Sequence, residues 1–161
     1  MKPLFALGIS AGFLVGCFIW LTLAVPVLGL IAWVSLISAG AYFSAGGGVD
    51  GLVKPMAAGT LGVIFTVVAL YAIGALGGGT TPFVLTVTLL AFLIVMSSGI
   101  QLFSNIPAAF MAAAAYVGAG GKIDSSIVFV LVSWGAGLVL AFGIDNLSKA
   151  IAGSGRSASS T

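Results

Sequence analysis

The chain has 161 residues, of which 61% are hydrophobic and only 5% are charged, a composition typical of an integral membrane protein and far from that of soluble domains. The net charge of +2 is too small for a nucleic-acid surface, which excludes a nucleic-acid partner. Because the chain has one cysteine, no histidine and no glutamate, we expect no metal site, no cofactor and no catalytic residues, and therefore no enzyme.

Proline- and glycine-rich breaks divide the apolar chain into six segments. The segments run over residues 4–24, 27–44, 55–76, 83–103, 107–118 and 126–148. A helix needs about 20 apolar residues to cross a bilayer, so the sequence predicts an all-α membrane protein with six transmembrane helices in contact with lipid. Residues 152–161 are small and polar, and we expect them to form a disordered tail.

The first segment carries a doubled GxxxG pattern at Gly8, Gly12 and Gly16. Small residues at this spacing predict that the helix packs closely against another helix. We also expect a homo-oligomer, because a chain of this length gives a thin bundle with much small-residue surface. Cys17 follows an apolar run as in a lipoprotein signal, but the chain continues without a polar tether, which favours an uncleaved helix.

The basic residues indicate the orientation of the chain. With a cytoplasmic amino terminus, six crossings place four basic residues inside, Lys2, Lys54, Lys149 and Arg156, and only Lys122 outside. This distribution agrees with the positive-inside rule and predicts a multi-pass protein with both termini in the cytoplasm. If the fifth segment instead enters and returns on one side, the count becomes three to two, so the charges favour six crossings over five.

The fifth segment, residues 107–118, has twelve residues, or about 18 Å of helix, which is shorter than the hydrocarbon thickness of about 30 Å. The preceding residues 104–107 read Ser-Asn-Ile-Pro and admit two interpretations. They form either a surface turn in which Asn105 caps the next helix, or a break inside the membrane. In the second case the helix start, Asn105 and Gln101 face a small solute.

An internal repeat is visible without a gap. The stretch AYFSAGGGVD at 41–50 aligns with AYVGAGGKID at 115–124, an offset of 74 residues. The match includes uncommon residues, Tyr42 with Tyr116 and Asp50 with Asp124. Each Asp either caps the helix that follows it or lies at the mouth of a path, close to a lysine.

The repeat predicts two three-helix units, residues 1–76 and 77–151. Because three crossings reverse the side of entry, the units are expected to be inverted with respect to each other. Sixteen residues separate Pro26 from Tyr42 but only nine separate Pro107 from Tyr116. The second unit is therefore expected to have lost about two helical turns, or to have moved its break inward.

Inverted repeats recur in channels and transporters, which by analogy predicts a channel or facilitator for a small, uncharged solute. The lack of charged residues in the middle of the segments favours a passive conduit over a pump. The candidate pathway residues are Gln101, Ser104, Asn105, Pro107, Ala108, Tyr42, Tyr116 and Trp134, with Asp50 and Asp124 as candidate loop mouths. The alternative is a non-transporting membrane scaffold or accessory subunit, which the GxxxG face and the apolar interior favour.

Two longer stretches, SAGAYFSAGGGVDGLV and FSNIPAAFMAAAAYVGAGG, carry a resemblance to a known family. At these residues the chain resembles the YcdZ-like family of small bacterial inner-membrane proteins of unassigned function. The resemblance implies a location in the bacterial inner membrane. It implies no activity and no catalytic residues.

Overall fold

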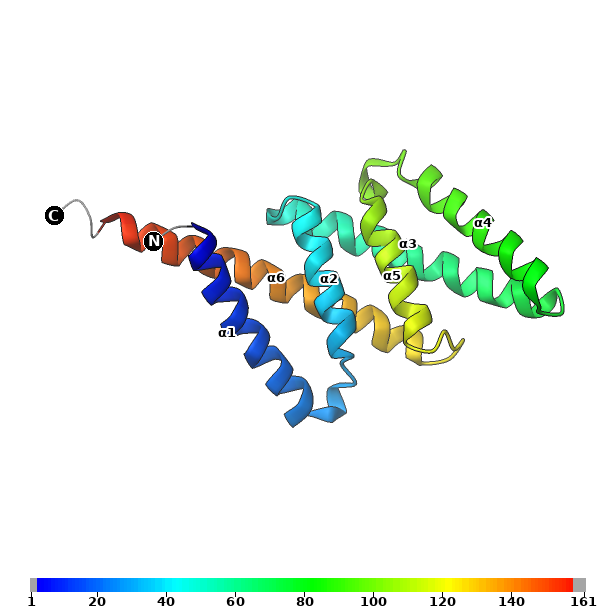
Figure 1. Cartoon of the computed structure of the whole chain (residues 1–161), viewed down its shortest axis with the longest axis horizontal. Helices are drawn as coiled ribbons and strands as arrows, with labels where there is room; N and C mark the ends of the chain where they lie inside the picture. The colour runs from blue at the N-terminus through cyan, green and yellow to red at the C-terminus, as the bar shows by residue number, and fades with distance from the viewer. Residues whose placement is uncertain (1–2, 158–161) are drawn as a thin grey trace.

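The computed structural model describes residues 3–157, and within them the protein is entirely helical (Figure 1). The elements, in chain order, are α1 (Pro3–Ala24), the 3-10 turn η1 (Pro26–Leu28), α2 (Ala32–Ser44), α3 (Gly48–Ala75), α4 (Thr80–Ser97), the 3-10 turn η2 (Gln101–Phe103), α5 (Ile106–Gly118) and α6 (Ser126–Ser157). The predicted all-α class is confirmed.

Four of these helices, α1, α3, α4 and α6, are long and apolar enough to cross a membrane, which indicates a membrane protein. Helices α2 and α5 have 13 residues each, or about 20 Å at 1.5 Å per residue. Both are shorter than the hydrocarbon layer of about 30 Å. The crossing of the membrane by these two helices stays a prediction.

The expected difference in length between the two halves is wrong. Helix α2 begins at Ala32 and not near Pro26, because Pro26–Leu28 form a separate 3-10 turn. Gly29 ends that turn with φ +61°, a left-handed conformation that glycine adopts without strain. Helices α2 and α5 are equally long, and each boundary of α5 lies 74 residues after that of α2.

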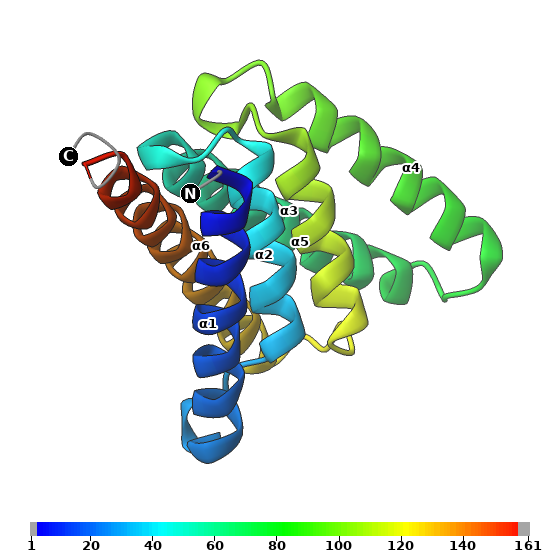
Figure 2. The ribbon, with the colours of Figure 1, turned by 60° about the vertical axis from the view of Figure 1, so that its left-hand side comes forward.

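Helices α2 and α5 lie side by side at the centre of the molecule and run in opposite directions (Figures 1 and 2). Helix α2 packs mainly against α6, and α5 packs mainly against α3. Helix α1 lies against α6, and α4 lies against α3 and α5. The third helix of each half therefore packs on the second helix of the other half.

Two glycines bring these helices into backbone contact. A Cβ atom on Gly62 of α3 would overlap the carbonyl oxygen of Ala109 in α5. A Cβ on Gly137 of α6 would likewise overlap the carbonyl oxygen of Ser35 in α2. Ser35 and Ala109 are separated by the repeat offset of 74 residues, whereas Gly62 and Gly137 are 75 residues apart, so the two close helix crossings are similar but not identical.

The glycine face of α1 does not pack against another helix within residues 3–157. Gly8, Gly12 and Gly16 are exposed, and a Cβ on any of them would have no neighbouring atom within 4 Å. Helix α1 instead buries Ala6 and Ser10, which lie about 200° around the helix from Gly8 and Gly12 at 100° per residue. The predicted contact is therefore not made within the described residues, because α1 packs on α6 through the opposite side, and a contact with a helix of another chain stays a prediction.

Helix α6 also differs from expectation at its end. It continues to Ser157, into the segment 152–161 that was expected to be disordered. No proline occurs in α6 to stop the helix. Residues 158–161 lie outside the described part of the chain.

Candidate functional site

The two repeat tyrosines are fully buried and hold loops in place. The Tyr42 hydroxyl accepts a hydrogen bond from the Gly48 N–H at 2.8 Å and donates one to Asp145 Oδ2 at 2.8 Å. The Tyr116 hydroxyl donates to the carbonyl oxygen of Lys122 at 2.7 Å. Gly48 and Lys122 are 74 residues apart. Tyr42 therefore holds the first residue of α3, and Tyr116 holds the loop before α6.

Sequence reasoning missed Asp145, which joins α6 to α2 through the Tyr42 hydroxyl. Its Oδ2 atom accepts hydrogen bonds from Tyr42 and, at 2.8 Å, from Lys149 Nζ. Its side chain is only 16% exposed. The spacing of Asp145 and Lys149, one helical turn apart, was visible in the sequence. Its link to Tyr42, 103 residues away, was not.

Trp134, a predicted pathway residue, fills the protein interior. Its ring is fully buried, and a Cβ on Gly59 of α3 would overlap it. Its Nε1–H donates to the carbonyl oxygen of Pro55 at 3.0 Å. A buried indole requires such a partner, so the environment of Trp134 is that of a packing residue that joins α6 to α3.

Asn105 caps α5, as the surface-turn interpretation predicts. Its Oδ1 atom accepts a hydrogen bond from the Ala108 N–H at 3.0 Å. Ser104, Asn105 and Pro107 line a depression of about 250 Å³ beside Ser44 and Lys54, near the ends of α2 and α3. The lysine and the serines make this a polar end of the molecule.

The backbone N–H just before α2 is hydrogen-bonded to a side chain of a helix far away in the sequence. The Ile31 N–H donates to Ser133 Oγ at 2.8 Å, and Ser35 Oγ donates to the Ser133 carbonyl oxygen at 2.8 Å. Ser133 Oγ also donates to the Phe129 carbonyl oxygen at 2.6 Å. No local sequence signal identifies this contact, because Ile31 and Ser133 are 102 residues apart.

The two repeat aspartates occupy different positions. Asp124 precedes α6 and accepts a hydrogen bond from the Ser126 N–H at 2.8 Å, which confirms the capping interpretation for this residue. Hydrogen bonding with Ser126 and, to a smaller extent, the charge of Lys122 lower the pKa of Asp124. Asp50 lies inside the first turn of α3 and pairs with Lys54 Nζ at 2.7 Å.

The candidate pathway residues fall into two groups. Ser104, Asn105 and Pro107 border the polar depression described above, and Gln101 borders a neighbouring one of about 280 Å³ with Asp50 and Lys54. The other four, Tyr42, Ala108, Tyr116 and Trp134, are fully enclosed by protein atoms.

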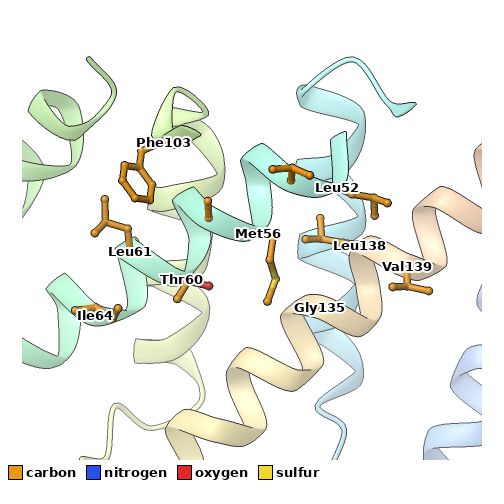
Figure 3. Close-up of a pocket in the computed structure, with 11 residues that line it drawn as sticks. Leu52, Met56, Thr60, Leu61, Ile64, Phe103, Gly135, Leu138 and Val139 are labelled. Carbon is orange, nitrogen blue, oxygen red and sulfur yellow. The ribbon is translucent and has the colours of Figure 1, made fainter. Parts of the chain in front are cut away.

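A larger apolar groove, open to the outside of the molecule, was not predicted from the sequence. It has a volume of about 810 Å³ and lies between α3 and α6 (Figure 3). Met56 and Leu61 of α3, Leu138 of α6 and Phe103 of η2 contribute to its walls. Its size falls within the range of about 300–1,000 Å³ that is usual for sites of small organic molecules.

Comparison with known proteins identified one family. A family model described as "Protein of unknown function (DUF1097)" matches residues 8–149. Searches of curated proteins and of solved structures gave no match. The predicted resemblance to a family of unassigned function is confirmed at that level, and the YcdZ-like name stays a prediction.

Proposed function

The chain belongs to this DUF1097 family of unknown function, and on that premise we propose that it is a membrane scaffold or accessory subunit. We further propose that its six helices form two inverted three-helix repeats in a bacterial inner membrane. Both termini are then cytoplasmic, which follows the excess of basic residues on that side.

The observation that carries this proposal is the packing of the central helices. Gly62 touches the backbone of α5, Gly137 touches the backbone of α2, and the ring of Trp134 lies on Gly59 between α6 and α3. These contacts close the centre of the molecule, where α2 meets α6 and α3 meets α5, and transporters built from inverted repeats have their solute site in this region. The open space between the repeats is the apolar groove at the outer side of α3 and α6. A closely packed centre suits a protein that presents its outer surface to partners.

The start of α5 supports the same proposal. A solute site at a helix start needs free N–H groups that face the solute. In α5 the Ile106 N–H is bonded to the Ser104 carbonyl oxygen, the Ala108 N–H is bonded to Asn105 Oδ1, and Pro107 has no N–H. These donors are therefore bonded within the protein and do not face a solute.

The surface offered for assembly is the exposed glycine face of α1, formed by Gly8, Gly12 and Gly16. Glycines at this spacing allow two helix backbones to approach closely within lipid, where packing rather than the hydrophobic effect drives association. A membrane helix, either of another protein or of a second copy, is the proposed partner.

A conduit for a small, uncharged solute is the second candidate. It is favoured by the two 13-residue helices α2 and α5, each preceded by a 3-10 turn. Interrupted helices in corresponding positions of two repeats are typical of transporters. In this case Asn105 and Ala108 would border the path only after the core had opened.

Two measurements on the full-length protein distinguish these candidates. Proteoliposomes are tested for urea and glycerol permeability by stopped-flow light scattering, with protein-free vesicles as the control. The scaffold predicts equal permeability, whereas added flux that Ala108→Leu abolishes would establish the conduit.

In the second measurement, a photo-crosslinking side chain replaces Phe13, which is 63% exposed beside Gly12. The scaffold predicts a crosslinked product with a membrane polypeptide, and this product is lost in the Gly12→Leu variant. A product that persists in Gly12→Leu would refute the α1 surface.

A further inference from the structure

The apolar cavity between α3 and α6 has the form of a lipid-chain groove. It extends along α3 from Leu52 to Ile64, or about 18 Å at 1.5 Å per residue. One leaflet contributes about 15 Å of hydrocarbon, half of the total thickness of about 30 Å. Figure 3 shows Met56, Thr60 and Leu138 along this groove, and almost all its lining side chains are apolar.

A polar pocket adjoins one end of the groove. The depression of about 280 Å³ lined by Asp50, Lys54 and Gln101 shares Val53 with the apolar cavity. A molecule that occupied both spaces would need a polar end of modest size and a long apolar chain. A phospholipid has these two parts, and its headgroup would lie at the polar pocket with one acyl chain in the groove.

The charges of the polar pocket indicate the kind of headgroup. Lys54 Nζ lies 2.7 Å from Asp50 Oδ2, and the two side chains are 28% and 69% exposed. An ammonium group has three donors, and the Asp50 carboxylate accepts one bond from it, so further donors can face a phosphate. The Asp50 carboxylate has acceptor sites left for an additional cation.

A zwitterionic headgroup complements this pair. Its phosphate lies beside Lys54, and its primary ammonium donates hydrogen bonds to Asp50. A headgroup with only negative charge would be attracted by Lys54 and repelled by Asp50. A quaternary ammonium would balance the charge of Asp50 but has no N–H to donate.

From this complementarity we propose that the protein binds one phosphatidylethanolamine molecule, with the headgroup at Asp50, Lys54 and Gln101 and an acyl chain between α3 and α6. The site is separate from the α1 glycine face, so the inference stands or fails independently of the scaffold proposal.

Native mass spectrometry of the full-length protein, released from nanodiscs that hold equal amounts of three phospholipids, tests the proposal. The lipids are phosphatidylethanolamine, phosphatidylcholine and phosphatidylglycerol with identical acyl chains. We expect one bound lipid per chain, with phosphatidylethanolamine enriched several-fold over the other two. Equal retention of the three lipids would refute the headgroup assignment.

Two substitutions test the parts of the site separately. Asp50→Asn removes the repulsion of anionic headgroups, and we expect the preference to shift from phosphatidylethanolamine to phosphatidylglycerol. Val139→Trp fills the groove, and we expect loss of the bound lipid. Val128→Trp is the matched control, because Val128 is an exposed valine of α6 outside the groove lining.

Three outcomes would overturn the inference. The first is an unchanged lipid preference in Asp50→Asn. The second is full lipid retention in Val139→Trp. The third is a protein dimer without lipid that Val139→Trp converts to a monomer, because a second copy would then occupy the groove.

Discussion

We expect the stability of the protein to depend most clearly on the glycine at each of the two central helix crossings. Gly62→Ala and Gly137→Ala each add one methyl group at a point where the nearest atom is a backbone carbonyl oxygen. A backbone atom cannot rotate away as a flexible side chain can. The two helices must therefore separate, and the contacts along the crossing weaken.

The size of the effect follows from two opposing contributions. Overpacking a close-packed interior costs about 1–3 kcal/mol, whereas replacing a helical glycine by alanine stabilises the helix by up to about 1 kcal/mol. Gly74→Ala measures the second contribution alone, because Gly74 lies in α3 and a Cβ there would have no neighbour within 4 Å. Relative to Gly74→Ala, each crossing variant should lose about 1–3 kcal/mol.

Reversible unfolding in mixed detergent, followed by circular dichroism, measures these differences. Because a Cβ on either glycine would overlap a backbone carbonyl oxygen of the facing helix, we expect Gly62→Ala and Gly137→Ala to have similar effects. If both matched Gly74→Ala within about 0.5 kcal/mol, the usual limit of additivity between independent sites, the backbone contacts would not exist as described. A loss in only one variant would contradict the similarity of the two crossings.

Three other predictions use the same unfolding assay. Tyr42→Phe removes a hydrogen bond to a charged carboxylate and should lower the free energy of unfolding by about 1.5–3 kcal/mol. Tyr116→Phe removes only a bond to a carbonyl and should lower it by about 0.5–1.5 kcal/mol. Equal losses in the two variants would contradict the described partners. Asn105→Ala should lower the free energy of unfolding by about 1 kcal/mol through loss of the α5 cap, whereas Asn105→Asp should be as stable as the wild type. Wild-type stability of Asn105→Ala would show that no cap exists. Trp134→Phe should lower the free energy of unfolding by about 1–3 kcal/mol because it leaves the Pro55 carbonyl without its indole partner. An unchanged free energy of unfolding would refute this prediction.

The sequence predicted those features that depend on local composition. The apolar segments became helices, and the glycine-rich breaks at 46–51, 77–82 and 118–124 each lie at a boundary between helices. The short fifth helix was predicted within one residue, as 107–118 against Ile106–Gly118. The offset of 74 residues, found from a ten-residue match, also relates the bounds of α2 and α5.

The predicted helix bounds were wrong at two prolines, because proline permits more than one backbone structure. Pro55 was interpreted as the start of a helix, but it is buried inside α3, which begins at Gly48. Membrane helices tolerate an internal proline because neighbouring groups satisfy the freed backbone atoms. Pro26 was predicted to be a break before a helix from residue 27, but it begins a 3-10 turn, and α2 begins only at Ala32. Only packing against other helices decides between these structures.

The contacts at the candidate site could not be predicted from the sequence for a different reason. Tyr42 meets Asp145 and Ile31 meets Ser133 across more than 100 residues, and no periodic pattern records such pairs. The groove between α3 and α6 likewise depends on how two helices from different halves cross. The exposed glycine face of α1 had the correct spacing for packing, but the buried side of that helix is formed by Ala6 and Ser10.

The difference between the two halves at Asn105 has a structural explanation. By the repeat offset, Asn105 corresponds to Ile31, and Ser133 corresponds to Gly59. Ser133 reaches back from α6 to the Ile31 N–H at the start of α2. Gly59 has no hydroxyl to offer the start of α5, and its surface is covered by the indole of Trp134.

Helix α5 is capped in another way, because Asn105 Oδ1 accepts a hydrogen bond from the Ala108 N–H, which by the repeat offset corresponds to the N–H of Val34 and not to that of Ile31. Backbone N–H groups in a low-dielectric environment must find partners within the protein. A serine on the facing helix accepts a hydrogen bond from the Ile31 N–H just before α2, whereas an asparagine accepts one from the Ala108 N–H in the first turn of α5. Asn105 of the Ser-Asn-Ile-Pro sequence therefore has a structural role as the cap of α5, in the half where Gly59 gives its place to Trp134.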